Sequence, residues 1–304
     1  MTTPRITVRA LQALVAVYEE QSFSRAAARE NATQSGMSTQ VKSLETRLGT
    51  ALMIRERGGV TLTPAGEILY RMGRRTLRDL LAAEAEIAEI DGAVTGPVRA
   101  GLIPALTRAL AAPVLDAFTA RWPGVSVTLV EEYSHALTAR VRDGDLDFAL
   151  VPAGDLPPGL SARFVARDTE LIVSRPGRFD AAHLAPLPLA SLEGAHLLVP
   201  SAINVRRGRI DAALAAHGVR PAALLEIDGM LGTLEMVAAS DWCAILPAAL
   251  CHPDRAGNVR ALNPLADPPM TTDYVAIARD DAAPSRAARL LSDAIAAKVA
   301  RIVA

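Results

Sequence analysis

The segment 33–49, TQSGMSTQVKSLETRLG, carries side chains that could read a nucleic acid. Wound as a helix, it places Met37, Val41, Leu44 and Leu48 within an arc of about 60°. The other side holds short hydroxyls, an amide and one amine: Gln34, Ser35, Ser38, Thr39 and Lys42. Such groups can bond base edges and phosphates. Taken alone, the pattern is also typical of an ordinary surface helix, so the neighbouring elements must decide.

Two helices are predicted ahead of this segment. Residues 8–20 carry apolar side chains at i, i+3, i+4 and i+7, which indicates a core-facing stripe. A shorter helix follows in 22–30, where Ser22 or Ser24 can cap the first turn and three alanines allow close packing. The connection 31–33 is short, and Thr33 can cap the next helix. This spacing is that of a helix-turn-helix with 33–49 as the recognition helix.

A recognition helix enters the major groove with its N-terminus, so each outward group has an expected task. Gln34 can bond adenine in bidentate fashion, and Thr39 can also offer a methyl group to thymine. Lys42 can reach the DNA backbone, and the free N–H groups at the helix start favour phosphate. On the helix-turn-helix, the candidate DNA-binding residues are Ser24, Thr33, Gln34, Ser35, Ser38, Thr39 and Lys42.

A small hairpin is predicted next, over 52–62, because apolar residues flank the turn pair Gly58 and Gly59. Arg55 and Arg57 stand two apart and therefore share a strand face. They form either a solvated hairpin edge or, beside a helix-turn-helix, a wing that reaches an adjacent groove or phosphate. We include Arg55 and Arg57 among the candidate DNA-binding residues.

A long helix is predicted over 64–91, with Thr63 as its cap and Pro64 in its first turn. Apolar or small residues recur along it every 3.5 residues or so, as in a two-helix seam. These residues are Leu69, Met72, Thr76, Leu80, Ala83, Ile87 and Ile90. We expect this helix to pair with its copy in a second subunit.

The distribution of charge supports a polyanionic partner for the N-terminal part. The whole chain of 304 residues has a formal net charge of −1. Residues 1–78 hold twelve Lys/Arg and six Asp/Glu, a net +6, and the remainder holds twenty and twenty-seven, a net −7. A basic N-terminal part on an otherwise acidic chain indicates that the N-terminal part binds a polyanion.

The segment 13–67, ALVAVYEEQSFSRAAARENATQSGMSTQVKSLETRLGTALMIRERGGVTLTPAGE, resembles the winged helix-turn-helix of LysR-type transcriptional regulators. The match covers nearly all of residues 8–92 without gaps. It implies double-stranded operator DNA as partner, a dimerising linker helix, an effector-binding domain and a homodimer or dimer of dimers. The chain departs from the family pattern at Ser35 and Thr39, where proline and a basic residue are usual.

The following two hundred residues predict an α/β body. Glycines and a proline break the helical period at 91–98, which we interpret as a hinge. Strand-like and helical segments then alternate, as expected for βαβ units and a parallel sheet. The resemblance, looser here, implies two Rossmann-like subdomains like those of a periplasmic binding protein. The expected domains are the winged helix-turn-helix 1–63, the linker helix 64–92, the hinge 93–97 and the effector-binding domain 98–304. Within the last, subdomain I is 98–165 with 270–304, and subdomain II is 166–269.

In open α/β sheets a ligand binds beyond the carboxyl ends of the strands, so the cleft between the subdomains is the expected effector site. Position along the chain selects as candidates Pro104, Ala105, Leu106, Thr107, Ser134, Pro152, Ser201, Asn204, Met230 and Thr233. Each is equally explained as a helix cap or as punctuation after a strand. Helix N-termini and hydroxyls suit a small carboxylate. Arg206 and Arg207 could pair with it or be solvated.

Other classes of protein find little support. The motifs G-x-G-x-x-G, G-x-x-x-x-G-K-[ST], G-x-S-x-G and H-E-x-x-H are absent, and the five histidines are scattered, so we expect neither an enzyme nor a cofactor. Cys243, Cys251 and His252 lack the further ligands of a metal site, and we expect both cysteines to be buried. The alternative is a solute-binding or enzymatic α/β protein whose N-terminal helices serve only for oligomerisation. Because no signal peptide and no membrane span is evident, a cytoplasmic protein is expected.

Overall fold

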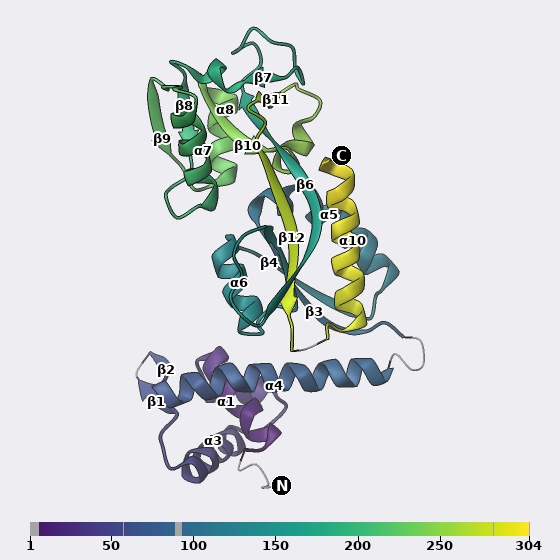
Figure 1. The fold of residues 1–304 in the computed structure, drawn as a ribbon. Helices are drawn as coiled ribbons and strands as arrows, with labels where there is room; N and C mark the ends of the chain where they lie inside the picture. Colours follow the sequence, from purple (N-terminus) through teal and green to yellow (C-terminus); the bar gives the residue numbers. More distant parts are fainter. Residues whose placement is uncertain (1–5, 57, 89–92, 282, 304) are drawn as a thin grey trace. The chain divides into compact units, whose positions relative to one another are not determined.

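The computed structural model describes residues 6–56, 58–88, 93–281 and 283–303. The chain divides into two compact units, Met1–Pro97 with Asp143–Asp145, and Val98–Arg142 with Leu146–Ala304. Each is described below by itself (Figure 1). Within the described residues, no helix has the length and apolar character required to cross a membrane, and no cluster of metal-ligating side chains occurs.

The N-terminal unit contains the predicted helix-turn-helix and hairpin. Its elements are α1 (Val8–Glu20), α2 (Phe23–Arg29), α3 (Gln34–Leu48), β1 (Met53–Glu56), β2 (Gly59–Leu62) and α4 (Pro64–Ala88). Ser22 caps α2, and Thr33 caps α3 by accepting a hydrogen bond from the Gly36 amide at 3.1 Å. β1 and β2 pair antiparallel. The predicted elements of this unit are therefore confirmed, except that Arg57 and Ile90 lie outside the described residues.

Small and branched side chains hold the three short helices together. Met37 and Val41 of α3 pack with Phe23 and the alanines of α2 and α1 in one buried cluster. Leu44 packs with Leu14 in a second cluster. Leu48, expected in the same stripe, is 38% exposed; it is the last residue of α3 and belongs to neither buried cluster. The packing therefore fixes α3 by its apolar side.

One glycine of α4 is required by a close approach. A Cβ on Gly66 would lie 1.9 Å from the backbone oxygen of Leu52, which precedes β1. Only a residue without a side chain lets the start of α4 approach this backbone.

Among the described residues, the C-terminal unit is built on a ten-stranded sheet with the order β4-β3-β5-β12-β6-β10-β8-β9; β11 also pairs with β6, and β7 pairs with β11. Its strands are β3 (Gly96–Leu102), β4 (Val125–Glu131), β5 (Phe148–Pro152), β6 (Leu160–Ser174), β7 (Leu187–Pro188), β8 (His196–Val199), β9 (Ala223–Glu226), β10 (Trp242–Pro247), β11 (Ala261–Asp267) and β12 (Thr271–Arg279). Its helices are α5 (Pro104–Arg121), α6 (Ser134–Arg142), α7 (Val205–Ala216), α8 (Met230–Ala239), α9 (Ala248–Cys251) and α10 (Arg286–Val303), with the 3-10 turns η2 (Leu189–Leu192) and η3 (His252–Asp254).

The expected parallel sheet is parallel only in part. The pairs β3–β5, β8–β9 and β8–β10 are parallel, but β6 runs antiparallel to β10, β11 and β12. The reason lies in the path of the chain. β6 leaves the part of this unit that contains β3, β4 and β5, and β12 returns to it, so the two strands run in opposite directions side by side (Figure 1). β6 pairs with β12 as far as Thr169 and with β10 from Glu170 onward, so one strand serves both halves. Strand β11 was not predicted.

Candidate functional site

The polar side of α3 is open to solvent in the N-terminal unit. Thr33, Gln34, Ser35, Thr39 and Lys42 are exposed, and Ser38 is half-buried. The apolar side of the same helix is buried by α1 and α2. The helix therefore presents hydrogen-bonding groups outward from a rigid support, as contact with base edges requires.

Two contacts between candidate DNA-binding residues order this face. The Ser24 hydroxyl donates to the Gln34 Oε1 atom at 3.2 Å and so holds the amide from the preceding helix. Arg55 of β1 donates from Nη2 to the Ser38 hydroxyl at 2.9 Å, and its guanidinium lies 3.9 Å above the centre of the Phe23 ring. The hairpin arginine is thus attached to the recognition helix, which adds a cation to the face.

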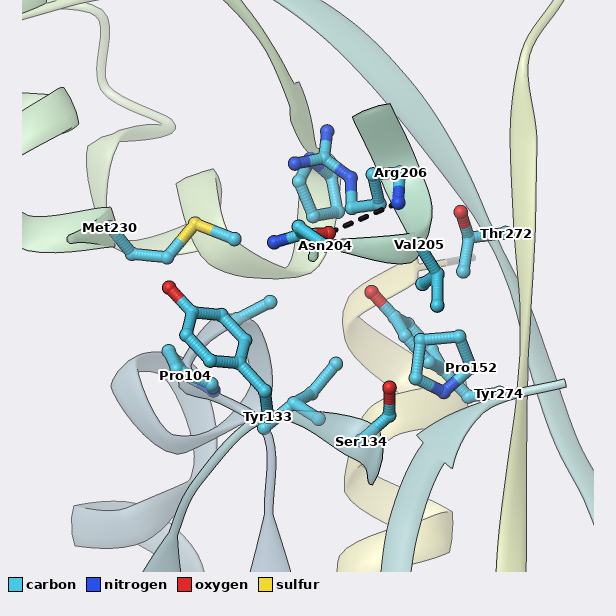
Figure 2. A pocket seen from close by; sticks show the side chains of 13 residues that line it. Pro104, Tyr133, Ser134, Pro152, Asn204, Val205, Arg206, Met230, Thr272 and Tyr274 are labelled. Carbon is cyan, nitrogen blue, oxygen red and sulfur yellow. Dashed lines mark hydrogen bonds between the residues drawn. The ribbon is translucent and has the colours of Figure 1, made fainter. Parts of the chain in front are cut away.

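A cavity with an empty volume of about 420 Å³ lies in the C-terminal unit (Figure 2). Its lining is mostly apolar, with a few polar groups among the thirteen residues: Ile103, Pro104, Ala105, Tyr133, Ser134, Pro152, Asn204, Val205, Arg206, Met230, Pro247, Thr272 and Tyr274. A smaller cavity of about 280 Å³ shares Asn204, Arg206 and Met230 with it and extends to Thr233. A mostly apolar lining with a few polar groups is typical of a site for a small organic molecule.

Four helices begin at this cavity. Pro104, Ser134, Val205 and Met230 line it, and each is the first residue of its helix, α5, α6, α7 and α8. Asn204 caps α7 through its Oδ1 atom, which accepts from the Arg206 amide at 3.0 Å (Figure 2). The N-terminal ends of helix dipoles are positive, so four of them around one cavity favour a negative group inside it.

The two arginines of α7 are engaged by acidic residues of the protein. Arg206 is buried; it donates to Glu170 through Nε at 3.2 Å and Nη2 at 2.6 Å, and to the Ile245 carbonyl at 2.7 Å. Arg207 pairs with Asp211 and Glu226 on the surface. The expectation that Arg206 is solvated is therefore wrong, and both arginines have anionic partners within the protein.

Buried carboxylates lie behind the floor of the cavity, on β6. Glu170 accepts a hydrogen bond from the Thr272 hydroxyl at 3.1 Å. Asp168 is 0% exposed, and its Oδ2 atom accepts from the Tyr274 hydroxyl at 3.0 Å and from the Ala249 amide at 3.1 Å. Burial raises the pKa of Asp168 from 3.8 to about 6, although the two hydrogen bonds oppose the change. The Oδ1 atom is buried without a partner among the described residues.

Comparison with known proteins decides the family. Residues 8–67 match the family of bacterial regulatory helix-turn-helix proteins of the lysR type, and residues 91–300 match the LysR substrate binding domain. The chain belongs to the LysR family of transcriptional regulators. The chain is thus a DNA-binding regulator with an effector-binding domain, and it is not an enzyme.

Individual relatives agree with this assignment over most of the chain. The regulator BbuR of Bordetella bronchiseptica is 27% identical over 283 residues, which cover 93% of this chain and 87% of BbuR. The uncharacterized regulator YfeR of Shigella flexneri is 30% identical over 251 residues, covering 80% and 78% of the two chains. A full-length OxyR variant of Pseudomonas aeruginosa has a similar fold, with a TM-score of 0.73 at 21% identity over 99% of both chains.

In this LysR-type regulator, six of the ten candidate effector residues line the larger cavity: Pro104, Ala105, Ser134, Pro152, Asn204 and Met230. Thr233 lines the smaller one. Leu106 lies outside both because its side chain points into the core and is fully buried, and Thr107 donates its hydroxyl to Ile103 of its own helix turn. Ser201 also lies outside the two linings; its amide donates to Asp228.

Sequence reasoning missed several lining residues of the regulator. Tyr133 directly precedes the predicted cap Ser134, and Val205 follows Asn204, so proximity in sequence could have indicated both. Thr272 and Tyr274 lie on the returning strand β12, far along the chain from the other residues, and no local signal marks them.

The two cysteines of the regulator are buried and free, as expected. Burial raises the pKa of the Cys243 thiol to about 11 and that of Cys251 still further. Both thiols are therefore protonated at neutral pH, and a protonated thiol is a poor nucleophile toward oxidants.

Proposed function

We propose that this regulator places the N-terminal part of α3 in the major groove of its operator, and that a small carboxylate in the cavity of residues 98–304 controls this binding. The observation that carries the first part is the exposed polar row from Gln34 to Lys42 on a helix whose opposite side is fixed by α1 and α2. Arg55, attached to Ser38, supplies a cation for a neighbouring phosphate.

The second part of the proposal depends on the four helix N-termini at the cavity. An anion there would interact favourably with α5, α6, α7 and α8 at once, and α7 is tied through Arg206 to Glu170 on β6. A ligand that contacts these helices at once would favour one arrangement of them over another. The affinity for DNA could then change by no more than the ratio of the ligand's affinities for the two arrangements.

The regulator is proposed to act as a homodimer or dimer of dimers. α4 exposes Met72, Leu80 and Ile87 at helical spacing, and an exposed apolar row of this kind favours pairing with a second copy. Leu69 packs instead into the core of its own unit with Leu14 and Leu44, so it does not belong to the seam. Since its target is genomic DNA, we propose that the protein works in the cytoplasm.

The DNA proposal is tested by footprinting and titration of the intergenic segment beside the regulator's own gene. Gln34→Ala and Ser38→Ala should each weaken specific binding by about 1–3 kcal/mol and leave scrambled DNA nearly unaffected. Thr46→Ala, on the exposed last turns of α3, is the matched control and should change neither. Arg55→Ala should weaken both DNAs alike and flatten the salt dependence. Unchanged discrimination in the Gln34 and Ser38 variants would remove these residues from the interface.

The effector proposal is tested by thermal stabilisation of the full chain with a panel of small carboxylates. Val205→Trp places a large side chain at the cavity, where Val205 is 58% exposed, and should abolish stabilisation by any bound member. Val259→Trp is the control, since Val259 is 54% exposed and lies outside the cavity lining. Ligand stabilisation that survives Val205→Trp would place the effector elsewhere.

A further inference from the structure

Tyr274 and Thr272 line the cavity, and both already donate their hydroxyl protons to other residues of the protein. Tyr274 donates to the carboxylate of Asp168, and Thr272 donates to the carboxylate of Glu170. An ionised carboxylate can only accept, so in both pairs the proton must come from the hydroxyl. Thr272 also accepts from the Arg209 guanidinium at 3.0 Å, which occupies one of its lone pairs. Tyr274 therefore faces the cavity as a hydrogen-bond acceptor.

Tyr133, on the opposite side of the cavity, also donates its hydroxyl proton to another residue. Its hydroxyl donates to the backbone carbonyl of Asp228, and a carbonyl oxygen is an acceptor only. Both tyrosines line the cavity, and each hydroxyl oxygen keeps a lone pair once its proton is donated (Figure 2). A bare carboxylate, which has no donor, would meet them unfavourably, because two acceptors repel.

The donors of the cavity are elsewhere, at the helix starts. Because the Oδ1 atom of Asn204 accepts from the Arg206 amide, its Nδ2 group remains as a donor. The first-turn backbone N–H groups of the helices that begin at the cavity are further donors, except at the first residue of α5, because Pro104 has no N–H. The cavity therefore separates donor walls, which suit an anion, from acceptor tyrosines, which suit an N–H group.

Charge favours a cationic donor beside Tyr274. The Asp168 carboxylate behind this tyrosine forms no salt bridge with any residue of the described chain, and Glu170, which is paired with Arg206, lies on the same strand. A tyrosine that donates to a carboxylate is itself a stronger acceptor. An ammonium group at Tyr274 would gain both this hydrogen bond and the attraction of a buried negative charge.

Resting on the proposed function, we infer that the effector is a small zwitterion that carries an ammonium group beside its carboxylate, the chemical class of the amino acids. The carboxylate lies at the helix N-termini and Asn204, and the ammonium group lies at Tyr274. The apolar lining of Ile103, Val205 and Met230 receives the remaining part of the molecule.

The test compares pairs of ligands that differ only in the amino group, by calorimetric titration of the full-length protein. The twenty amino acids are screened first, and each one that binds is compared with its desamino acid, for example leucine with 4-methylpentanoate and phenylalanine with 3-phenylpropanoate. We expect the amino acid of a binding pair to bind at least about tenfold more tightly than its desamino partner, as for a hydrogen bond to a charged group.

A variant assigns this preference to Tyr274. Tyr274→Phe should reduce the ratio within the pair to near one, while Tyr70→Phe in the other unit should leave it unchanged; an unchanged ratio in Tyr274→Phe would overturn the placement of the ammonium group. Circular dichroism confirms folding of each variant, and the comparison of amino with desamino acids on the unaltered chain tests the proposal even if Tyr274→Phe unfolds. Equal binding of amino and desamino acids, with both abolished by Val205→Trp, would overturn the zwitterion and retain the carboxylate cavity. Binding of no amino acid, or binding that Val205→Trp leaves intact, would also overturn it.

Discussion

Replacement of Asp168 by asparagine tests the electrostatics at the crossing of the two halves of the effector-binding domain. This carboxyl is 0% exposed and has a pKa of about 6 in the folded chain, against 3.8 for an ordinary aspartate. A carboxyl whose pKa is raised by folding stabilises the fold fully below pH 3.8, and this contribution is lost as the pH rises through 6. The difference between the two pKa values corresponds to about 3 kcal/mol.

Asp168→Asn should remove most of this cost at neutral pH. The amide oxygen can still accept from Tyr274 and Ala249, while the neutral side chain avoids burial of a charge. We expect the variant to be more stable than the wild type by about 2–3 kcal/mol at pH 7.5, or roughly 5–10 °C in Tm. Between pH 7.5 and pH 4.5 the advantage should shrink toward zero.

The assay is urea unfolding of the full chain followed by tryptophan fluorescence. The chain has two tryptophans, Trp122 and Trp242, and both belong to the C-terminal unit, so the signal reports on the unit that contains Asp168. Asp116→Asn, at an exposed position of α5, is the control. A loss of stability in Asp168→Asn at pH 7.5, or a difference from wild type that stays constant from pH 4.5 to 7.5, would refute the reasoning.

Further predictions concern backbone packing, assembly and the thiols. Gly66→Ala should destabilise the N-terminal unit by about 3 kcal/mol, because its Cβ would overlap the Leu52 carbonyl. Gly208→Ala in α7, with open space around it, should instead stabilise its unit by about 1 kcal/mol. Denaturation followed by circular dichroism measures both changes in the free energy of unfolding. Leu80→Glu should shift the oligomer toward monomer in sedimentation equilibrium and Leu184→Glu, exposed in the other unit, should not; an unchanged mass would exclude the α4 seam. Cys243 and Cys251 should react with a thiol reagent in the native protein much more slowly than in urea, and fast labelling would show that the buried environment is wrong.

The N-terminal unit was predictable because its determinants are local. The apolar period of 33–49, the cap at Thr33 and the glycine pair 58–59 at the start of β2 each act within a few residues, and the observed α3 and hairpin follow them. What the sequence did not show is the contact between elements. Arg55 attaches to Ser38 and Phe23, and Leu69 turns into the core, because β1 and α4 pack on helices that are distant in sequence.

The effector-binding domain was predictable only in part. Alternation of apolar strands and helices indicated an α/β body, and the first residues of three of the four helices at the cavity, Pro104, Ser134 and Met230, were found as candidates, because helix starts have sequence signals. The return of the chain near residue 270 was implied by the family resemblance, but the antiparallel pairing of β6 with β12 was not predicted, since a strand carries no local signal for the direction of its partner. Thr272 and Tyr274 reach the cavity only through this return.

The sequence by itself therefore determined the elements, the polar side of α3 and the basic character of the N-terminal part, since hydrophobic period, caps and charge are properties of short stretches. Tertiary structure alone decided that Arg206 is held by Glu170, that Asp168 is buried, and that Tyr133 and Tyr274 face the cavity as acceptors. The direction of a hydrogen bond and the pKa of a carboxyl depend on partners brought together from distant strands, and no local pattern encodes those partners.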